Sequence, residues 1–283
     1  MATSTTTSFV KTWTPTDYGQ LVVATASKLS VALRVGVTHV TERNEFRIPL
    51  VTSELQAAWV GEAQPATESN IGTGEEIVKP KKTIAYSRLS AELVDDSDPG
   101  AAENVGLSGS RALADIIDAA LFGSADGAGN IPKGLGAFND AALTTLSAGA
   151  AWTNVDPFSD AVYDVDTAGG TLTSFIANPA DAKIIAKLKK EAGSNEPLLA
   201  TDATSPTKRV LSGLPLFTSL RVPAGTIYGI DAQNLHIVVR KGTTIDLDRS
   251  VFHQTDEVAV RVLSRVGFGY SHPKSIARIK LTS

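Results

Sequence analysis

Residues 57–65 read AAWVGEAQP and residues 79–93 read KPKKTIAYSRLSAEL, separated by the polar segment ATESNIGTGEEIV at 66–78. A polar, glycine-containing segment between extended stretches is typical of a surface hairpin. A hairpin of this kind has almost nothing of its own to bury, and an isolated hairpin is at best marginally stable in water. The local residues alone leave open whether Trp59 is an ordinary core tryptophan beside the hairpin or contacts another surface.

The composition is that of a chain that folds around a packed core. The chain has 283 residues, of which 42% are hydrophobic and 20% charged, which suits one large domain or two modest ones. A net charge of -4 argues against a general nucleic-acid binder. The absence of cysteine excludes disulfides and thiolate metal sites. Neither a signal peptide nor a run of roughly 18 apolar residues is present, so we expect a cytosolic chain with no membrane contact.

The N-terminal part predicts an arm, a helix and two strands. The first eleven residues are rich in Thr and Ser and predict a mobile arm. Thr14 and Pro15 suit the cap and first position of a helix that runs to about Ser30. The stretch VALRVGVTHV at 31–40 predicts a strand, and EFRIPLV at 45–51 predicts a second strand, placed at an edge by its proline.

The remainder predicts a long helix and a second subdomain. Asp98 and Pro99 suit the start of a helix of some 23 residues, about 35 Å long, which ends at a turn-rich linker. From Asp156 short helices and strands alternate, which favours an α/β-flavoured subdomain. The stretch EVAVRVLSRVGFGY at 257–270 alternates apolar and polar residues and predicts a long strand.

No motif in the chain predicts catalysis or a bound cofactor. The four histidines lack metal-ligand spacing, and GSADGAGN at 123–130 lacks the lysine and hydroxyl residue that end a phosphate loop. The stretch GLSGS at 106–110 misses the nucleophile-elbow pattern by one position. The acidic residues at 95–98 are explained better as a helix start than as a cation site. We therefore expect no enzyme, no metal and no cofactor.

Six pieces of sequence follow one another in an order that resembles the major capsid proteins of tailed bacteriophages, the Hong Kong 97 fold family. No single piece is as specific as a metal motif, so their succession over nearly the whole chain carries the resemblance. The pieces are WVGEA at 59–63, IVKPKKTIAYSRLSAELVDDS at 77–97, LADIIDAALFG at 113–123, NIPKGL at 130–135, GLPLFTS at 213–219 and VLSRVGFGYSHPKSIARIK at 262–280.

The resemblance implies an α+β, Hong Kong 97-type capsid fold. Such a fold has an N-terminal arm, an extended β-hairpin loop, a peripheral domain with a long spine helix and long strands, and an axial α/β domain. The implied ranges are 1–50 for the arm, helix and strands, 51–92 for the extended loop, 93–155 for the peripheral domain with its spine helix, 156–250 for the axial domain, and 251–283 for the strands that return to the peripheral domain.

In the family the hairpin leaves its own subunit and lies across a neighbour. By this resemblance Trp59 is expected near the base of the hairpin, packed on the body or on the adjacent subunit, and Gly61 would let backbones approach closely. The subunit-interface residues expected from the resemblance are Trp59, Gly61, Glu62, Glu68, Glu75, Glu76, Lys79, Lys81 and Arg88.

The function implied is that of a major capsid protein. Its subunits would form pentamers and hexamers of an icosahedral head shell around a double-stranded DNA genome, in the virion, after assembly in the bacterial host cytoplasm. The acidic balance suits loose contact with DNA that must be packed and ejected. Only about fifty residues precede the hairpin, whereas some relatives carry a large scaffolding region that a protease removes. Either the chain begins after such a cleavage site or scaffolding comes from a separate protein, which is expected beside a portal protein. A decoration protein is a further candidate partner.

Two other function classes stay open from the residues. The first is an encapsulin-like nanocompartment shell with the same fold and an enzyme cargo, which the Thr/Ser-rich arm and the polar hairpin disfavour. The second is a soluble hydrolase or sugar-binding module, which the missing nucleophile and base disfavour.

Some relatives join a loop lysine of one subunit to an asparagine of the next. In this chain residues 66–78 contain no lysine, and Asn234 is the only asparagine after Asn195. We therefore expect a shell without covalent links between subunits.

Overall fold

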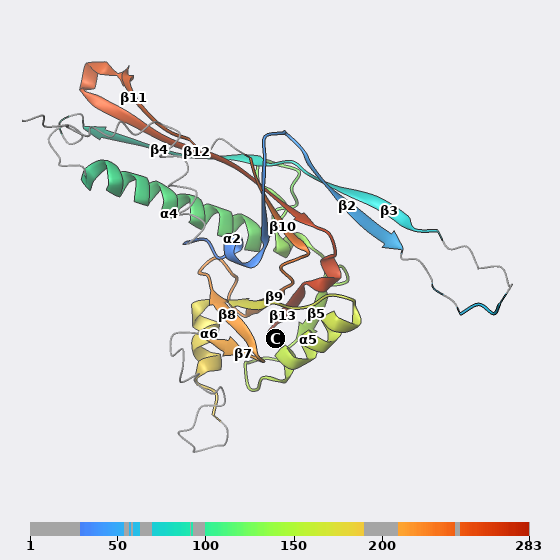
Figure 1. The fold of residues 1–283 in the computed structure, drawn as a ribbon. Coiled ribbons are helices and arrows are strands. Elements are labelled where there is room, and N and C mark those ends of the chain that lie inside the picture. Colours follow the sequence, from blue (N-terminus) through green and yellow to red (C-terminus); the bar gives the residue numbers. More distant parts are fainter. Residues whose placement is uncertain are drawn as a thin grey trace, which may run out of the picture.

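The computed structural model of the protein describes residues 29–53, 57, 59–62, 70–90, 92, 100–189, 209–240 and 244–282. In these ranges the chain forms a body with long strands, a more compact body beside it, and a two-stranded hairpin that projects from the first (Figure 1). The expected arm and first helix, and the expected Asp98–Pro99 helix start, lie outside the described residues.

Helices and strands make up most of the described chain. The helices are α2 (Ala32–Val35), α4 (Gly100–Phe122), α5 (Asp156–Thr167) and α6 (Pro179–Ala186), with short 3-10 turns at Leu135–Ala137, His253–Thr255 and Pro273–Ser275. The strands are β1 (Val37–Thr41), β2 (Phe46–Ser53), β3 (Gly72–Val78), β4 (Lys81–Ser90), β5 (Thr144–Ser147), β6 (Ser174–Ala177), β7 (Val210–Leu211), β8 (Leu214–Thr218), β9 (Thr226–Ile230), β10 (Leu235–Arg240), β11 (Thr244–Phe252), β12 (Glu257–Tyr270) and β13 (Ala277–Lys280).

The long-sheet body consists of α4 and the five-stranded sheet β1-β10-β12-β11, in which β4 also pairs with β12. Strand β12 has the bounds that its alternation predicts, and its buried residues include Val258, Val260 and Val262. Helix α4 has the expected 23 residues and lies along the long strands (Figure 1). It approaches closely at Gly109, where a Cβ would lie 2.9 Å from Cγ2 of Val262.

The six-stranded body has the strand order β5-β13-β9-β6-β8-β7. Its main core contains Phe158 and Val165 of α5, Ile185 of α6 and Ile279 of β13, all fully buried. Helix α6 begins at the pair Asn178–Pro179, residue types that suit the cap and the first position of a helix, and the Asn178 side chain accepts a hydrogen bond from the backbone N–H of Ala180.

The expectation of a strand over 31–40 is wrong in its first half. Ala32–Val35 forms the helical turn α2, and only Val37–Thr41 is a strand. The cause is Asp118 of α4, a buried carboxylate that accepts hydrogen bonds from the backbone N–H groups of Val31 and Ala32. Since a helix start leaves its N–H groups without intrahelical partners, this carboxylate favours the turn.

The strand pairings cross the domain boundaries expected at residues 156 and 250. Strand β10 and most of β11 lie within the range expected for the axial domain, yet both pair with β12 of the long sheet. Strands β5 and β13 lie outside that range, yet both belong to the six-stranded sheet. The chain therefore passes between the two bodies more often than a division into consecutive segments allows.

Candidate assembly surfaces

The hairpin of β2 and β3 forms a sheet of its own. Its two strands pair antiparallel from Phe46 opposite Val78 to Ser53 opposite Gly72, and neither strand belongs to a larger sheet of the described residues. Pro49 lies in β2, as an edge strand permits. In Figure 1 the hairpin extends away from both bodies.

The root of the hairpin is anchored by apolar contacts. Ile48 and Val78 are buried and form a small cluster with Val238 of β10. Gly267 and Gly269 of β12 make room for this cluster, since a Cβ on Gly269 would lie 2.5 Å from Cδ1 of Ile48 and one on Gly267 would lie 2.7 Å from Cγ1 of Val78. The glycines in VGFGY thus permit the close approach that seats the hairpin on the long sheet.

The opposite face of the hairpin is open to solvent. Val51 is 61% exposed and Ile77 is 45% exposed on the same face. Between them, an Arg47 guanidinium N–H donates to Oε2 of Glu75 at 3.0 Å. Glu76 points to the other face, where it is opposite Ile48 and half-buried. A face that exposes two apolar side chains beside an ion pair suits contact with another chain.

Trp59 lies beyond the far ends of the paired strands, in the segment that joins Ser53 to Gly72. The expectation that it lies near the base of the hairpin is therefore wrong, because the base is formed by Phe46 and Val78. Its side chain is 105% exposed, so it is not a core tryptophan of its own subunit. A fully exposed tryptophan is a strong candidate for burial against a partner.

The other predicted interface residues fall into two groups. Gly61 and Glu62 are exposed near Trp59, while Glu68 lies outside the described residues. Lys79 pairs with Glu45 at 3.1 Å beside the hairpin root. On β4, Lys81 is half-buried, and the Arg88 guanidinium lies 4.0 Å from the centre of the Phe252 ring and 4.0 Å from Glu257. The structure therefore does not bring the predicted residues into a single site.

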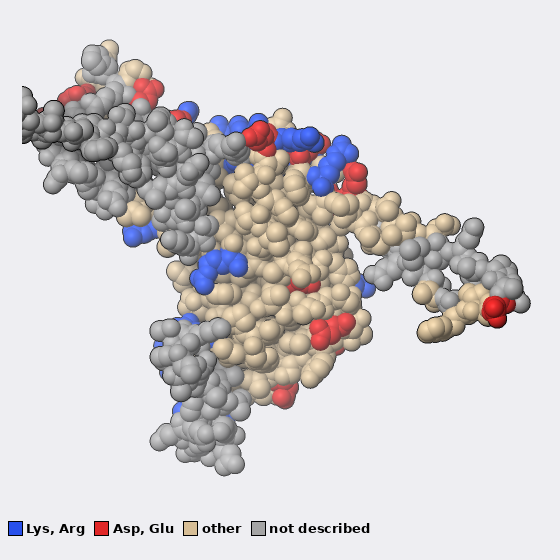
Figure 2. All heavy atoms as spheres, viewed as in Figure 1, with Lys and Arg blue, Asp and Glu red and all other residues tan. Residues whose placement is uncertain are grey.

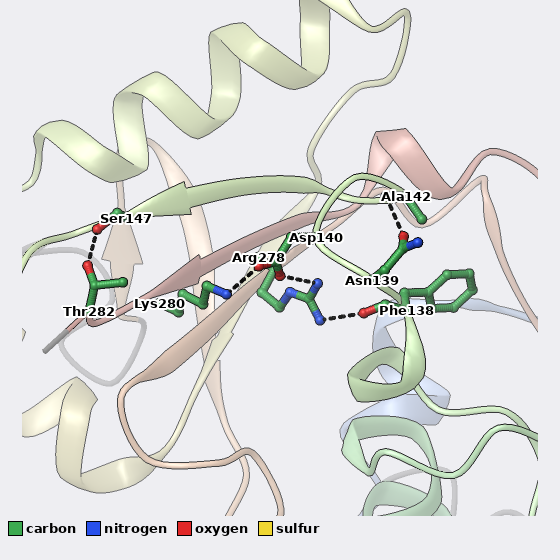
Figure 3. Close-up of polar contacts among 8 residues, drawn as sticks. All are labelled: Phe138, Asn139, Asp140, Ala142, Ser147, Arg278, Lys280 and Thr282. Carbon is green, nitrogen blue, oxygen red and sulfur yellow. Dashed lines mark hydrogen bonds and ion pairs between the residues drawn. The ribbon is translucent and has the colours of Figure 1, made fainter.

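A second surface, which the sequence did not predict, is a pocket of about 390 Å³ where the two bodies meet. Arg278 and Lys280 of β13 both donate to Asp140, at 2.8 and 2.6 Å (Figure 3). Across the pocket Arg221 forms a bidentate ion pair with Asp115 of α4. No spacing in the sequence indicates this cluster, because about 140 residues separate Asp140 from its partners.

These ion pairs hold both carboxylates in the charged form. The hydrogen bond from Lys280, helped by Arg278, lowers the pKa of Asp140. The hydrogen bond from Arg221 lowers the pKa of Asp115 in the same way, against a small opposing effect of burial. The pocket is therefore an ionised site at neutral pH.

Two histidines lie close together near the hairpin root. Nε2 of His39 and Nδ1 of His236 are 3.0 Å apart, and the His39 ring stacks on Phe46. Burial, and then the charge of His39, lowers the pKa of His236.

Over the described ranges, no cluster of three or more His, Asp or Glu residues has the geometry to hold a metal ion. None of the helices described has the length and apolar character to cross a membrane.

Charges of both signs are interspersed along the edge where the hairpin leaves the long sheet (Figure 2).

Comparison with known proteins identifies the family of the chain. The model of the phage capsid family matches residues 17–281. The chain belongs to the phage capsid family.

Solved structures show the same fold at low sequence identity. A capsid chain of a native GTA particle is 23% identical, with 92% of this chain and 91% of that chain covered and a TM-score of 0.68. A chain from Microbacterium phage Oxtober96 is 14% identical, with 100% of this chain and 96% of that chain covered and a TM-score of 0.74. A virus-like particle from Pyrococcus furiosus is 12% identical, with 92% and 96% covered and a TM-score of 0.61. No curated protein sequence matches the chain.

These findings confirm the α+β, Hong Kong 97-type capsid fold and the assignment of a shell-forming major capsid protein. Membership of the phage capsid family indicates a structural protein.

Proposed function

We propose that this capsid protein forms pentamers and hexamers of an icosahedral head shell in which each hairpin lies on a neighbouring subunit. The observation that carries the proposal is the hairpin itself. Among the described residues its buried apolar contacts lie at its root, its outer face exposes Val51 and Ile77, and a fully exposed Trp59 lies beyond its strands. A two-stranded sheet of this kind gains little stability alone, and a neighbour would cover it.

In this proposal the interface includes both groups of predicted residues. Trp59, Gly61 and Glu62, with Glu68, form the part of the loop that reaches the neighbour. Glu75, Glu76 and Lys79 lie along the hairpin, and Lys81 and Arg88 lie on β4. The six-stranded body takes the place of the axial domain around the fivefold and sixfold axes, and the long-sheet body that of the peripheral domain.

The shell encloses double-stranded DNA with which it makes loose contact, and it assembles in the cytoplasm of a bacterial host. The net charge of -4 supports loose contact, since phosphate binding requires a surplus of cations. A separate scaffolding protein and a portal protein complete the assembly, and the outer surface is open to a decoration protein.

Subunits are held in this shell without covalent links. The segment 54–71 between β2 and β3 contains no lysine. The amide of Asn234 donates to Asp231 at 2.7 Å and its oxygen accepts from Ser271 at 2.9 Å, so this side chain is engaged within its own subunit. Boiling particles in detergent should release one band near the chain mass of 29.6 kDa. A ladder of higher oligomers would contradict the proposal.

Electron microscopy of purified particles tests the main proposal. Large shells, empty or filled with DNA, are expected. Small shells with a protein cargo would favour the encapsulin-like alternative, for which the likeness to the Pyrococcus furiosus particle at a TM-score of 0.61 is the supporting observation. A protein that stays unassembled would contradict both shell functions and would reopen the hydrolase or sugar-binding alternative.

A further inference from the structure

The sheet of the six-stranded body separates two surfaces of opposite charge. Successive residues of a strand point to opposite faces. In β13, Ala277 and Ile279 face α5 and its core, so Arg278 and Lys280 face the other way, into the pocket. Helix α5 and the pocket are therefore on opposite faces of the same sheet.

The pocket face carries a surplus of positive charge. The residues that line it include three cations, Arg221, Arg278 and Lys280, and one carboxylate, Asp140. Arg221 also pairs with Asp115, which leaves one positive charge in surplus when both carboxylates are counted. The side chain of Arg221 is 48% exposed and that of Lys280 is 35% exposed, so both can be reached from outside.

Helix α5 carries only negative charge. Its sequence DPFSDAVYDVDT contains no Lys, Arg or His. Asp156, Asp160 and Asp164 are exposed and lie four residues apart, so they share one face of the helix with Tyr163, which is 71% exposed. Within the described part of the chain, none of these three carboxylates forms an ion pair.

This acidic stripe (Asp156, Asp160 and Asp164) is unfavourable in the isolated subunit toward its C-terminal end. At its N-terminal end Asp156 lies in the first turn, where the helix dipole favours an anion, and it accepts a hydrogen bond from the Asn154 amide at 2.6 Å. Like charges four residues apart on a helix repel one another. Asp164 also lies near the C-terminal end of α5, where the helix dipole disfavours an anion and where the last turn has no basic residue. Cations from outside the subunit would relieve both effects.

We propose that the acidic stripe of α5 docks on the Arg221–Lys280 pocket of a second copy of this chain. The inference rests on the proposed shell function and names the contact between adjacent six-stranded bodies. Contact between two different faces of identical subunits runs head to tail, and such contacts close into rings when the rotation permits. Each subunit would then give its stripe to one neighbour and its pocket to the other.

A second copy explains more than another occupant does. A phosphate or nucleic acid in the pocket would leave the acidic stripe without a partner. A cationic partner on α5 would leave the pocket unexplained. Docking between copies matches both surfaces at once, and their place on two different faces of one sheet permits head-to-tail contact.

Charge reversal on each side provides the test. One full-length variant carries Asp160→Lys and Asp164→Lys, and the other carries Arg221→Glu and Lys280→Glu. All four side chains are at least partly exposed, and circular dichroism should show folded subunits. Each variant should lose at least about tenfold in shell yield, with a loss that shrinks at high salt. The variant with all four reversals should regain shells.

Mixing the two double variants sharpens the test. Each should dock only with the other, so a ring must alternate between them. Six-membered rings can alternate and five-membered rings cannot. The mixture should therefore yield hexamers, seen by native mass spectrometry, but no closed shells.

Two variants serve as matched controls and should assemble like the parent. Asp166→Lys reverses a charge on α5 that lies about 200° around the helix from Asp164. Lys183→Glu reverses an exposed charge on α6 of the same body.

Three results would overturn the inference. Both double variants could form shells at the parental yield, the variant with all four reversals could fail to regain the lost shell yield, or the mixture could form closed shells. In each case a parent that forms shells leaves the proposed function standing. A parent that forms no particles would overturn the function and the inference together.

Discussion

The hairpin and the six-stranded body are both made of short strands, but they differ in what covers them. The six-stranded sheet is packed on α5 and α6 around side chains that are fully buried, such as Phe158 and Ile185. The hairpin has two strands, apolar anchors only at its root and an exposed outer face. The body contains its own stabilising contacts, whereas the proposed function assigns to a neighbour the cover that the exposed face of the hairpin lacks.

This difference teaches how one chain can be both a stable monomer and a shell component. Apolar burial contributes roughly 25 cal/mol per Å² wherever it occurs. In the six-stranded body that free energy is released on folding. In the hairpin it is released on folding at the root, where Ile48 and Val78 are buried, and under the proposed function the exposed face would contribute only on assembly. Substitutions in the two regions should therefore affect different measurements.

The largest effect on the free subunit is expected for Phe158→Ala. The Phe158 ring is fully buried and packs between Trp152 and Phe175. Its removal leaves a cavity and should lower the free energy of unfolding by about 3–5 kcal/mol. Denaturant titration of the unassembled protein checks this value. A loss below about 1 kcal/mol would mean that the six-stranded body is not a packed core.

A smaller effect is expected for Gly269→Ala at the hairpin root. The new methyl group would clash with Cδ1 of Ile48 and Cγ2 of Val78, at 2.5 and 2.6 Å. Overpacking of this kind costs about 1–3 kcal/mol. Hydrogen exchange should show faster exchange in β2 and β3 and unchanged exchange in β6 and β9. Equal loosening of both regions would contradict the separate seating of the hairpin.

Trp59→Ala should change the free subunit hardly at all. The ring is fully exposed, so the free energy of unfolding should stay within about 0.5 kcal/mol of the parent. The same substitution should weaken assembled particles, which release subunits at lower denaturant concentration. Leu220→Ala is a control, since Leu220 is a large apolar residue that is 79% exposed and lies outside the hairpin. Particles of this variant should be as stable as those of the parent. Stable particles with alanine at position 59 would remove Trp59 from the interface.

The smallest effect concerns pH. Because burial and His39 lower the pKa of His236 in the folded state, the unfolded chain binds the proton more tightly. The stabilisation by neutral His236 is complete above the ordinary histidine pKa of 6.5 and is lost as the pH falls through the lower folded value. Thermal unfolding should show a modest decrease in stability below pH 6.5 that His236→Gln reduces. If the His236→Gln variant loses as much thermal stability below pH 6.5 as the parent does, the effect belongs to other groups.

Much of the fold could be predicted from local pattern. The alternation at 257–270 predicts β12 with its observed bounds, and the spacing of apolar residues predicts α4 and its length. The Asn178–Pro179 pair predicts the start of α6. In each case the side chains that decide the structure are close together in the sequence, so a period or a cap reveals them.

Features that depend on distant residues could not be predicted in this way. The turn at Ala32–Val35 forms because of Asp118, which is 86 residues away from Ala32. The pocket around Asp140 depends on Lys280, 140 residues further along the chain. The expectation that Trp59 lies near the base of the hairpin is wrong, because composition does not reveal where strand pairing stops. The interface roles of the hairpin residues stay predictions.

The most direct test of the account replaces residues 54–71 with a short turn, so that β2 and β3 remain paired but lose the segment that holds Trp59. The account predicts a folded subunit with an unchanged unfolding midpoint and, by electron microscopy, no shells under conditions in which the parent forms them. Shells at parental yield, or a subunit that precipitates or unfolds at a much lower temperature, would contradict the claim that this segment acts on the neighbour and not on its own subunit.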